Sequence, residues 1–193
     1  MALLLVGLVL FIGIHSIRLF APEWRVFMMQ QLGKSNWKML HAAVAIVGLL
    51  TLIMGYGYAR YSAEWLWFPP VWTRHLAALL VLFAFIYIAA AAMPYSKIKA
   101  RVGCPMVVGI KLWALAHLIS NGTTADVLLF GSFLVWAVVN FVITRRQFKA
   151  EGVQFEAPDF KYDIIAVVVA VLAYALVAFY LHGLLIGVAP FAV

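Results

Sequence analysis

The chain has 193 residues, of which 67% are hydrophobic and 11% are charged, and its mean hydropathy is +1.05. Soluble globular domains carry about 25% charged residues, so this composition excludes that class. The formal net charge is +7, but the basic residues are scattered between apolar segments and form no patch, which argues against nucleic acid as a partner. We therefore expect an integral membrane protein.

Six apolar segments are long enough, at about 20 residues each, to cross a bilayer as helices. They are Met1–Ile17, Met39–Ala59, Leu76–Ser96, Val102–Ala125, Val127–Thr144 and Ile164 to about Gly187. The first has no basic leader and no small-residue cleavage site, so we interpret it as a retained helix. Continuous apolar runs such as AVVVAVLAYALVAF lack the alternation of transmembrane β-strands. The predicted fold is an all-α polytopic membrane helix bundle with about six transmembrane helices, formed by residues 1–193 as a single domain.

The basic residues predict how these helices are oriented. Most of the 14 Lys and Arg residues lie in the first, third and fifth junctions between the predicted spans. The second and fourth junctions hold only Arg60 and Arg74, and Lys111 lies inside a span. Because cytoplasmic loops are enriched in Lys and Arg, we expect the odd-numbered junctions in the cytoplasm and both termini outside.

Five histidines lie at or near membrane depth, where ionisable side chains are costly and are therefore functional candidates. His117, in LWALAHLISNG, is the strongest. On a helix, Trp113, Ser120 and Asn121 lie one turn away on the same face, so the imidazole belongs to a polar and aromatic stripe. The stripe indicates a site facing the bundle interior, although a histidine held structurally by Asn121 or by a neighbouring helix fits the pattern equally well.

Three other polar residues have simpler interpretations. His41 lies beside Lys38 at the start of the second span, where an interfacial histidine is expected. His182 precedes Gly183 in the last span, and Asn140 lies in the fifth. We interpret both as residues of helix packing.

His75 is predicted to lie at the same depth as His117. The third and fourth spans form a hairpin that turns near PYSKIK, and the two histidines are equally far from Ser96 along the chain. In an antiparallel pair of helices such residues lie at similar heights. Two histidines at one level favour non-covalently bound haem b, in which neutral imidazoles occupy the two axial positions.

Haem propionates need cationic partners. Arg74 directly precedes His75 on the predicted outer side, where basic residues are scarce, so we expect it to pair with them. Lys111 is the weaker choice, because it lies on a different side of the helix from His117. Zinc is less favoured, because no carboxylate or cysteine except Asp126 shares the outer depth.

His15, in GIHSIR, is the third candidate ligand. Phe11, His15 and Arg18 share a helix face, which suits an imidazole with a nearby anionic partner. Counting along the helix places His15 in the cytoplasmic half, away from His117 unless the first helix is tilted. From the residues alone, the partner of His117 stays open between His75 and His15.

Several kinds of chemistry are not expected. Cys104 is the only cysteine, so the chain has no internal disulfide and no C-x-x-C-H attachment site for c-type haem. It also lacks a nucleotide-binding loop, a serine triad and paired carboxylates, which argues against hydrolysis and phosphoryl transfer. The histidines remain the candidates for chemistry.

The motifs GIHSIR, PPVWTRH, CPMVVGIKLWALAHLISNG and LLFGSFLVWAV together resemble the NnrU family of bacterial membrane proteins. The resemblance covers nearly the whole chain, and LWALAHLISNG with the following LLFG is its most specific part. It implies a single NnrU-like transmembrane domain in the bacterial inner membrane. It also implies an association with denitrification and with nitric oxide or nitrite metabolism, and a relation to plant zeta-carotene isomerases, which carry haem b and isomerise a polyene double bond.

The resemblance assigns roles to two histidines. The histidine-serine motif of the isomerases falls on His15 and Ser16, and their alanine-histidine motif falls on Ala116 and His117. The resemblance therefore favours His15 and His117 as haem ligands, whereas the hairpin argument favours His75 opposite His117.

The sequence departs from the family pattern at two positions. Relatives commonly carry a histidine-proline pair where this chain has Cys104 and Pro105. The plant enzymes carry a cysteine three residues before the histidine of the fourth helix, where this chain has Ala114. An exchange of thiolate for histidine on the iron is therefore not expected here.

Three functions are compatible with these features. The first is a haem-dependent isomerase or redox enzyme acting on a lipid-soluble polyene or isoprenoid that enters from the bilayer. The second is a haem carrier or sensor that supports nitrogen-oxide respiration without a substrate of its own. The third is a transport or assembly factor without a cofactor, for which a lysine within a span would also be suitable.

The charge distribution yields a first testable prediction. A reporter fused after Val193 should be accessible only from outside the cytoplasm, because the last predicted helix leaves the basic fifth junction. Accessibility to an impermeant reagent in intact cells measures this. A reporter reached only from the cytoplasmic side would contradict the predicted orientation.

Overall fold

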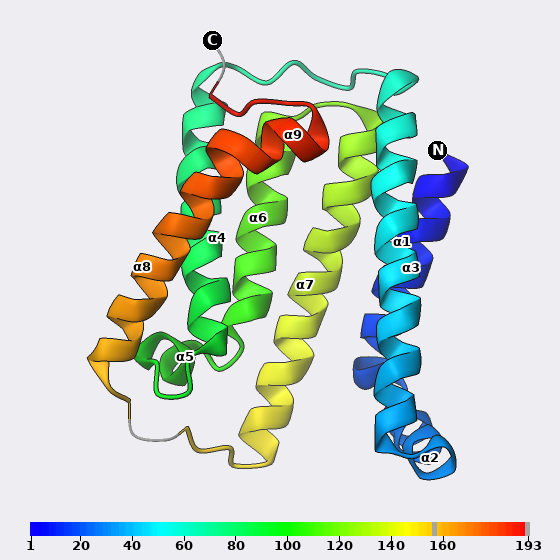
Figure 1. Ribbon diagram of the computed structural model, residues 1–193, viewed down its shortest axis with the longest axis vertical. Coiled ribbons are helices and arrows are strands. Elements are labelled where there is room, and N and C mark those ends of the chain that lie inside the picture. The colour runs from blue at the N-terminus through cyan, green and yellow to red at the C-terminus, as the bar shows by residue number, and fades with distance from the viewer. Residues whose placement is uncertain (156–157, 192–193) are drawn as a thin grey trace. The chain divides into compact units, whose positions relative to one another are not determined.

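A computed structural model of the chain describes residues 1–155 and 158–191 (Figure 1). Every regular element among these residues is a helix, and the only strand-like pairing is an isolated bridge between Trp65 and Thr123. The predicted all-α class is therefore confirmed.

Among the described residues, five helical stretches are long and apolar enough to cross a membrane. They are α1 (Ala2–Phe20), α3 (Lys34–Tyr61), α4 (Trp72–Ala92), α7 (Thr124–Ala150) and the run Phe160–Ile186. This last run consists of α8 (Phe160–Leu176), a π-helical turn η1 (Val177–Leu181) and α9 (His182–Ile186). The chain is thus a multi-pass membrane protein.

The fourth predicted span is shorter than expected. Helix α6 (Pro105–Ser120) has 16 residues, which is about 24 Å, against roughly 30 Å of hydrocarbon. It begins at Pro105, because proline suits the first position of a helix, and it ends before Asn121, which is extended. The predicted limits Val102–Ala125 were therefore wrong at both ends.

Two short helices in the junctions were not predicted. Helix α2 (Pro22–Leu32) follows α1 and starts on a proline, and α5 (Lys97–Val102) lies between α4 and α6. Helix α4 ends at Ala92, before Pro94, and not at Ser96 as predicted. The cause is again local, because the residue before a proline disfavours the helical conformation.

The chain forms two compact units, made of residues 1–66 with 123–132 and of residues 67–122 with 133–193. In the first unit α1 packs against α3 through glycines. A Cβ atom on Gly7 would lie 2.5 Å from the Leu52 backbone, and one on Gly55 would lie 2.5 Å from the Leu4 nitrogen. Small residues thus let the two backbones approach closely, as in many membrane helix pairs.

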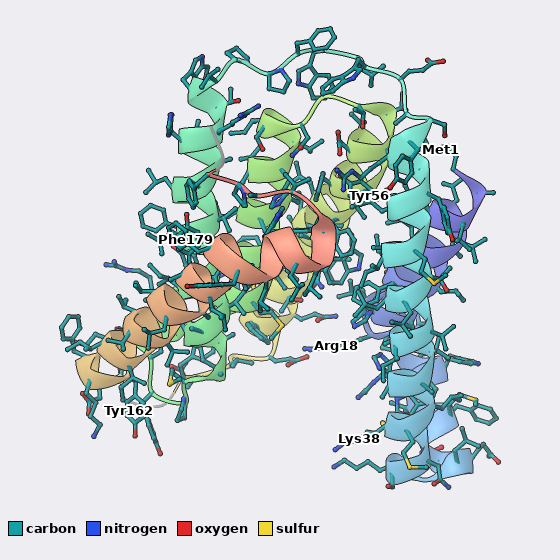
Figure 2. All side chains as sticks on the ribbon, turned by 45° about the horizontal axis from the view of Figure 1, so that its top comes forward. Met1, Arg18, Lys38, Tyr56, Tyr162 and Phe179 are labelled. Atoms are coloured by element: carbon teal, nitrogen blue, oxygen red, sulfur yellow. The ribbon has the colours of Figure 1, made fainter. Side chains whose placement is uncertain are left out.

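The first unit also contains a buried carboxylate, Asp126, in the first turn of α7. It accepts hydrogen bonds from the backbone nitrogen of Thr123 at 2.9 Å and from the Thr123 hydroxyl at 2.6 Å. Tyr56 of α3, labelled in Figure 2, donates to its other oxygen at 2.6 Å. Asp126 therefore caps α7 and connects it to α3.

In the second unit α4 packs against both α6 and α8 (Figure 1). The hairpin predicted for the third and fourth spans is thus present, with α5 in its turn. The Trp67 nitrogen donates to the Gly122 oxygen at 3.2 Å, so the start of α4 and the end of α6 lie at the same end of the unit. Near the opposite end of α4, the Ser96 hydroxyl donates to the buried Asp163 of α8 at 2.6 Å.

The packing of α1 on α3 leads to a second prediction. Gly55→Ala should destabilise the protein by about 1–3 kcal/mol, because the added methyl group meets backbone atoms that have no alternative rotamer. Gly57→Ala is the matched control, since nothing lies within 4 Å of its Cβ position, and it should be neutral or stabilising by up to about 1 kcal/mol. Thermal unfolding in detergent measures both, and equal midpoints for the two variants would contradict the packing.

Candidate functional site

His15 and His117, the two histidines marked by the family motifs, have the same local geometry. The Nδ1 atom of His15 lies 2.6 Å from the Phe11 carbonyl oxygen, and that of His117 lies 2.8 Å from the Trp113 carbonyl oxygen. A carbonyl oxygen only accepts, so Nδ1 carries the hydrogen, and in the neutral ring the lone pair is on Nε2. Histidines that bind metals commonly use this tautomer, with the other ring nitrogen donating to a carbonyl.

An aromatic side chain flanks each of these imidazoles from one helical turn earlier. The ring centroids of Phe11 and His15 are 4.4 Å apart, and those of Trp113 and His117 are 5.1 Å apart. Phe133 of α7 packs edge-on against Trp113, with centroids 5.5 Å apart. Both histidines are half-buried, so each imidazole lies in an apolar, aromatic environment.

The hydroxyl and amide groups near the two histidines bond to the helix backbone. Ser16 donates to the Ile12 carbonyl oxygen at 2.7 Å, and Ser120 donates to the Ala116 carbonyl oxygen at 2.8 Å. Asn121 donates to the carbonyl oxygen of His117 at 2.8 Å. Asn121 therefore supports the end of α6, and the His117 ring is oriented by the Trp113 carbonyl.

His15 and His117 each have another histidine beside them. These neighbours are His41, which was predicted to be interfacial, and His182, which was assigned to helix packing. In the first unit the rings of His15 and His41 are 5.4 Å apart and nearly perpendicular. In the second unit the rings of His117 and His182 are 6.5 Å apart, with an interplanar angle of 23°. Each candidate ligand thus has a second imidazole near it within its own unit.

The π-helical turn η1 explains how His182 reaches this position. The buried face of α8 runs through Asp163, Ala166 and Ala170, and in a regular α-helix the same face would continue to residues 181 and 185. A π-turn adds one residue and moves the face along by one position. Leu181 and His182 are both half-buried, whereas Leu185 is 69% exposed. Phe179, labelled in Figure 2, lies within this turn.

The histidine pairings could not be read from the sequence. His182 follows a uniformly apolar stretch, and no residue there marks a π-turn. The only available signal was its ionisable side chain within a span, which by itself indicates a functional candidate.

The remaining predicted site residues are exposed. His75 and Arg74 lie in the first turn of α4, at the end of the second unit where α6 also ends. Neither side chain has a hydrogen bond, ion pair or ring contact within the described residues. Arg18 is exposed in the last turn of α1, three residues after His15. The structure therefore leaves these cations accessible to an anionic group.

The donor set fits haem better than a protein-bound metal ion. Among the described residues, no cluster of three or more His, Cys, Asp or Glu side chains could hold a metal ion. A zinc site needs three or four protein ligands, and both oxygens of Asp126 are occupied in capping and by Tyr56. Haem iron needs only one or two protein ligands, and half-buried imidazoles could supply the appropriate nitrogen.

The comparisons with known proteins are consistent with the motifs. The family model described as NnrU protein matches residues 3–190. No curated protein and no solved structure matches the chain. Because the family model covers nearly all of the sequence, the chain belongs to the NnrU family.

Proposed function

We propose that this protein resides in the bacterial inner membrane and binds haem b non-covalently, with His117 as an axial ligand. The observation that carries the proposal is the geometry of His117, whose Nδ1 donates to the Trp113 carbonyl oxygen at 2.8 Å and leaves the lone pair on Nε2. An imidazole within an apolar helix is costly to place there, which makes His117 a functional candidate.

His15 is the favoured second ligand. It repeats the tautomer of His117 and has an aromatic residue in the same preceding position. His75 is exposed on the first turn of α4 and has no backbone acceptor that orients its ring within the described residues. The local chemistry and the family motif thus favour His15, and His75 remains the alternative.

The other side chains supply charge and shape. Arg74 and Arg18 are exposed cations suited to pair with propionates, and Trp113 provides an apolar wall beside His117. When bound, haem would supply an iron centre that changes oxidation state or interacts with an electron-rich double bond. We propose that the protein uses it as an isomerase or redox enzyme on a lipid-soluble polyene or isoprenoid, as the resemblance to the plant enzymes suggests.

The proposed ligand assignment also supports a second function. If His117 and His15 both held haem, the group would be suited to electron transfer rather than to binding a substrate. A haem carrier or sensor that supports denitrification is therefore the alternative. A transport or assembly role without a cofactor is less favoured, because the family motifs mark His15 and His117 as haem ligands.

A third prediction concerns the ligands. The purified protein should show a Soret band that shifts on reduction. His117→Ala and His15→Ala should each abolish the spectrum of six-coordinate haem, because each removes one axial nitrogen. His75→Ala is the matched control and should leave the spectrum unchanged, as measured by visible absorption and by haem content per chain.

Each outcome distinguishes the ligand assignments. Loss of the spectrum in His75→Ala, with His15→Ala unaffected, would replace His15 by His75 opposite His117. An intact six-coordinate spectrum in a folded His117→Ala protein would overturn the proposed site. A wild-type protein that neither retains nor takes up haem would support the role without a cofactor.

A fourth prediction separates enzyme from carrier. Haem-loaded protein, reduced and incubated with a cis-polyene in detergent, should convert it to the trans isomer, whereas His117→Ala should not. Chromatography of the extracted polyene measures the conversion. Equal isomer ratios with wild-type and variant protein would instead favour the carrier.

A further inference from the structure

Lys111 is a cation within an apolar helix and has an aromatic ring as its neighbour. It lies half-buried in α6, and its ammonium nitrogen is 3.7 Å from the centre of the Phe141 ring on α7. The only ion pair in the described part of the chain joins Lys161 to Asp159. Within the described residues, no carboxylate therefore forms an ion pair with Lys111.

The ring alone does not offset the cost of this charge. A lysine within a membrane helix is costly to place there. A desolvated cation–π contact offsets only part of that cost. An anion close to Lys111 would supply the missing stabilisation.

Arg145 is a second cation on the same helix face as the Phe141 ring. It follows Phe141 by four residues on α7, so the two side chains are neighbours. Its Nη1 donates to the Val102 carbonyl oxygen at 3.3 Å, and it lies 3.0 Å from where a Cβ on Gly103 would be. Gly103 has φ +81°, a conformation that favours glycine in the turn between α5 and α6. Its missing side chain also leaves space for the Arg145 guanidinium. The Val102 carbonyl oxygen accepts one of the five guanidinium N–H groups of Arg145. The remaining N–H groups are suited to donate to an anion.

Lys111 and Arg145 both interact electrostatically with the thiol of Cys104. Burial raises the pKa of this thiol, and the positive charges of Arg145 and Lys111 oppose that rise. The two charges therefore reach the same location where α5 meets α6, although they come from different helices.

Two acidic residues of the same unit already have partners. Asp163 accepts from the Ser96 hydroxyl and from the Ile98 nitrogen. Asp159 pairs with Lys161. These two carboxylates are therefore not paired with Lys111 or Arg145.

We propose that Lys111 and Arg145 form a binding site for an anionic phosphate group. Arg145 offers planar, paired donors that suit phosphate oxygens, and Lys111 adds a point charge. The phosphate belongs either to an anionic membrane phospholipid or to a soluble phosphate compound. For a lipid, exposed apolar side chains on both helices, among them Met106 and Val142, would contact the tail. This site is independent of the haem proposal.

Cys104 provides a built-in reporter, because it is the only cysteine. A phosphate bound between the two cations would remove their effect on the thiol and raise its pKa, and the thiolate is the reactive form. In nanodiscs containing phosphatidylglycerol, alkylation of Cys104 by iodoacetamide should be about 3- to 10-fold slower than in phosphatidylcholine alone, since one pKa unit changes the thiolate fraction about tenfold. Inorganic phosphate added to phosphatidylcholine nanodiscs tests the soluble source.

Charge-removing variants identify the site. Lys111→Met and Arg145→Gln should each abolish the difference between the two lipids, whereas Arg146→Gln, at the exposed neighbouring position, should keep it. Circular dichroism checks that each variant is folded. If Arg145→Gln does not fold, Arg145→Lys is the milder substitution at this position.

The outcomes are distinct from those of the haem experiments. If phosphatidylglycerol slows the alkylation of Cys104 and inorganic phosphate does not, the ligand is a lipid. If both slow it, the two cations form a general phosphate site. Equal alkylation rates in all nanodiscs would overturn the proposal. So would a lipid effect that Arg146→Gln removes as fully as Lys111→Met, because it would then reflect overall surface charge.

Discussion

The structure depends on one constraint, that polar side chains within hydrocarbon must find partners inside the protein. His15, Ser16, His117 and Ser120 all meet it in the same way, through the carbonyl oxygen four residues earlier. For a serine this bond satisfies the hydroxyl. For a histidine it also fixes the tautomer and leaves Nε2 free of the helix backbone, which makes each of these side chains a candidate metal ligand.

The same constraint organises the polar groups outside the candidate site. Asp126 is satisfied by Thr123 and Tyr56, and Asp163 is satisfied by Ser96 and Ile98. These carboxylates thereby join helices within each unit and are not available to neutralise other charges. Lys111 differs, because its neighbour is the Phe141 ring, and this difference is what makes an external anion the expected partner.

The long spans were predictable because continuous apolar runs have few alternatives in a bilayer. The sequence also contains the signal that ends α6 and starts α7, namely Asn121 and the T-x-x-D pattern of Thr123 and Asp126. Hydropathy alone extended the predicted span across this signal. The neighbours of the two candidate histidines were not predictable. His41 and His182 reach them through helix packing and through the π-turn η1, and neither feature follows from local residue preferences.

We propose above all that histidine side chains of this membrane protein hold haem b. The most direct measurement is the haem content of the purified wild-type protein, determined as its pyridine haemochrome and divided by the protein concentration. The account predicts one haem b per chain after expression with sufficient haem supply. Absence of haem from folded protein, even after incubation with excess haem, would contradict it.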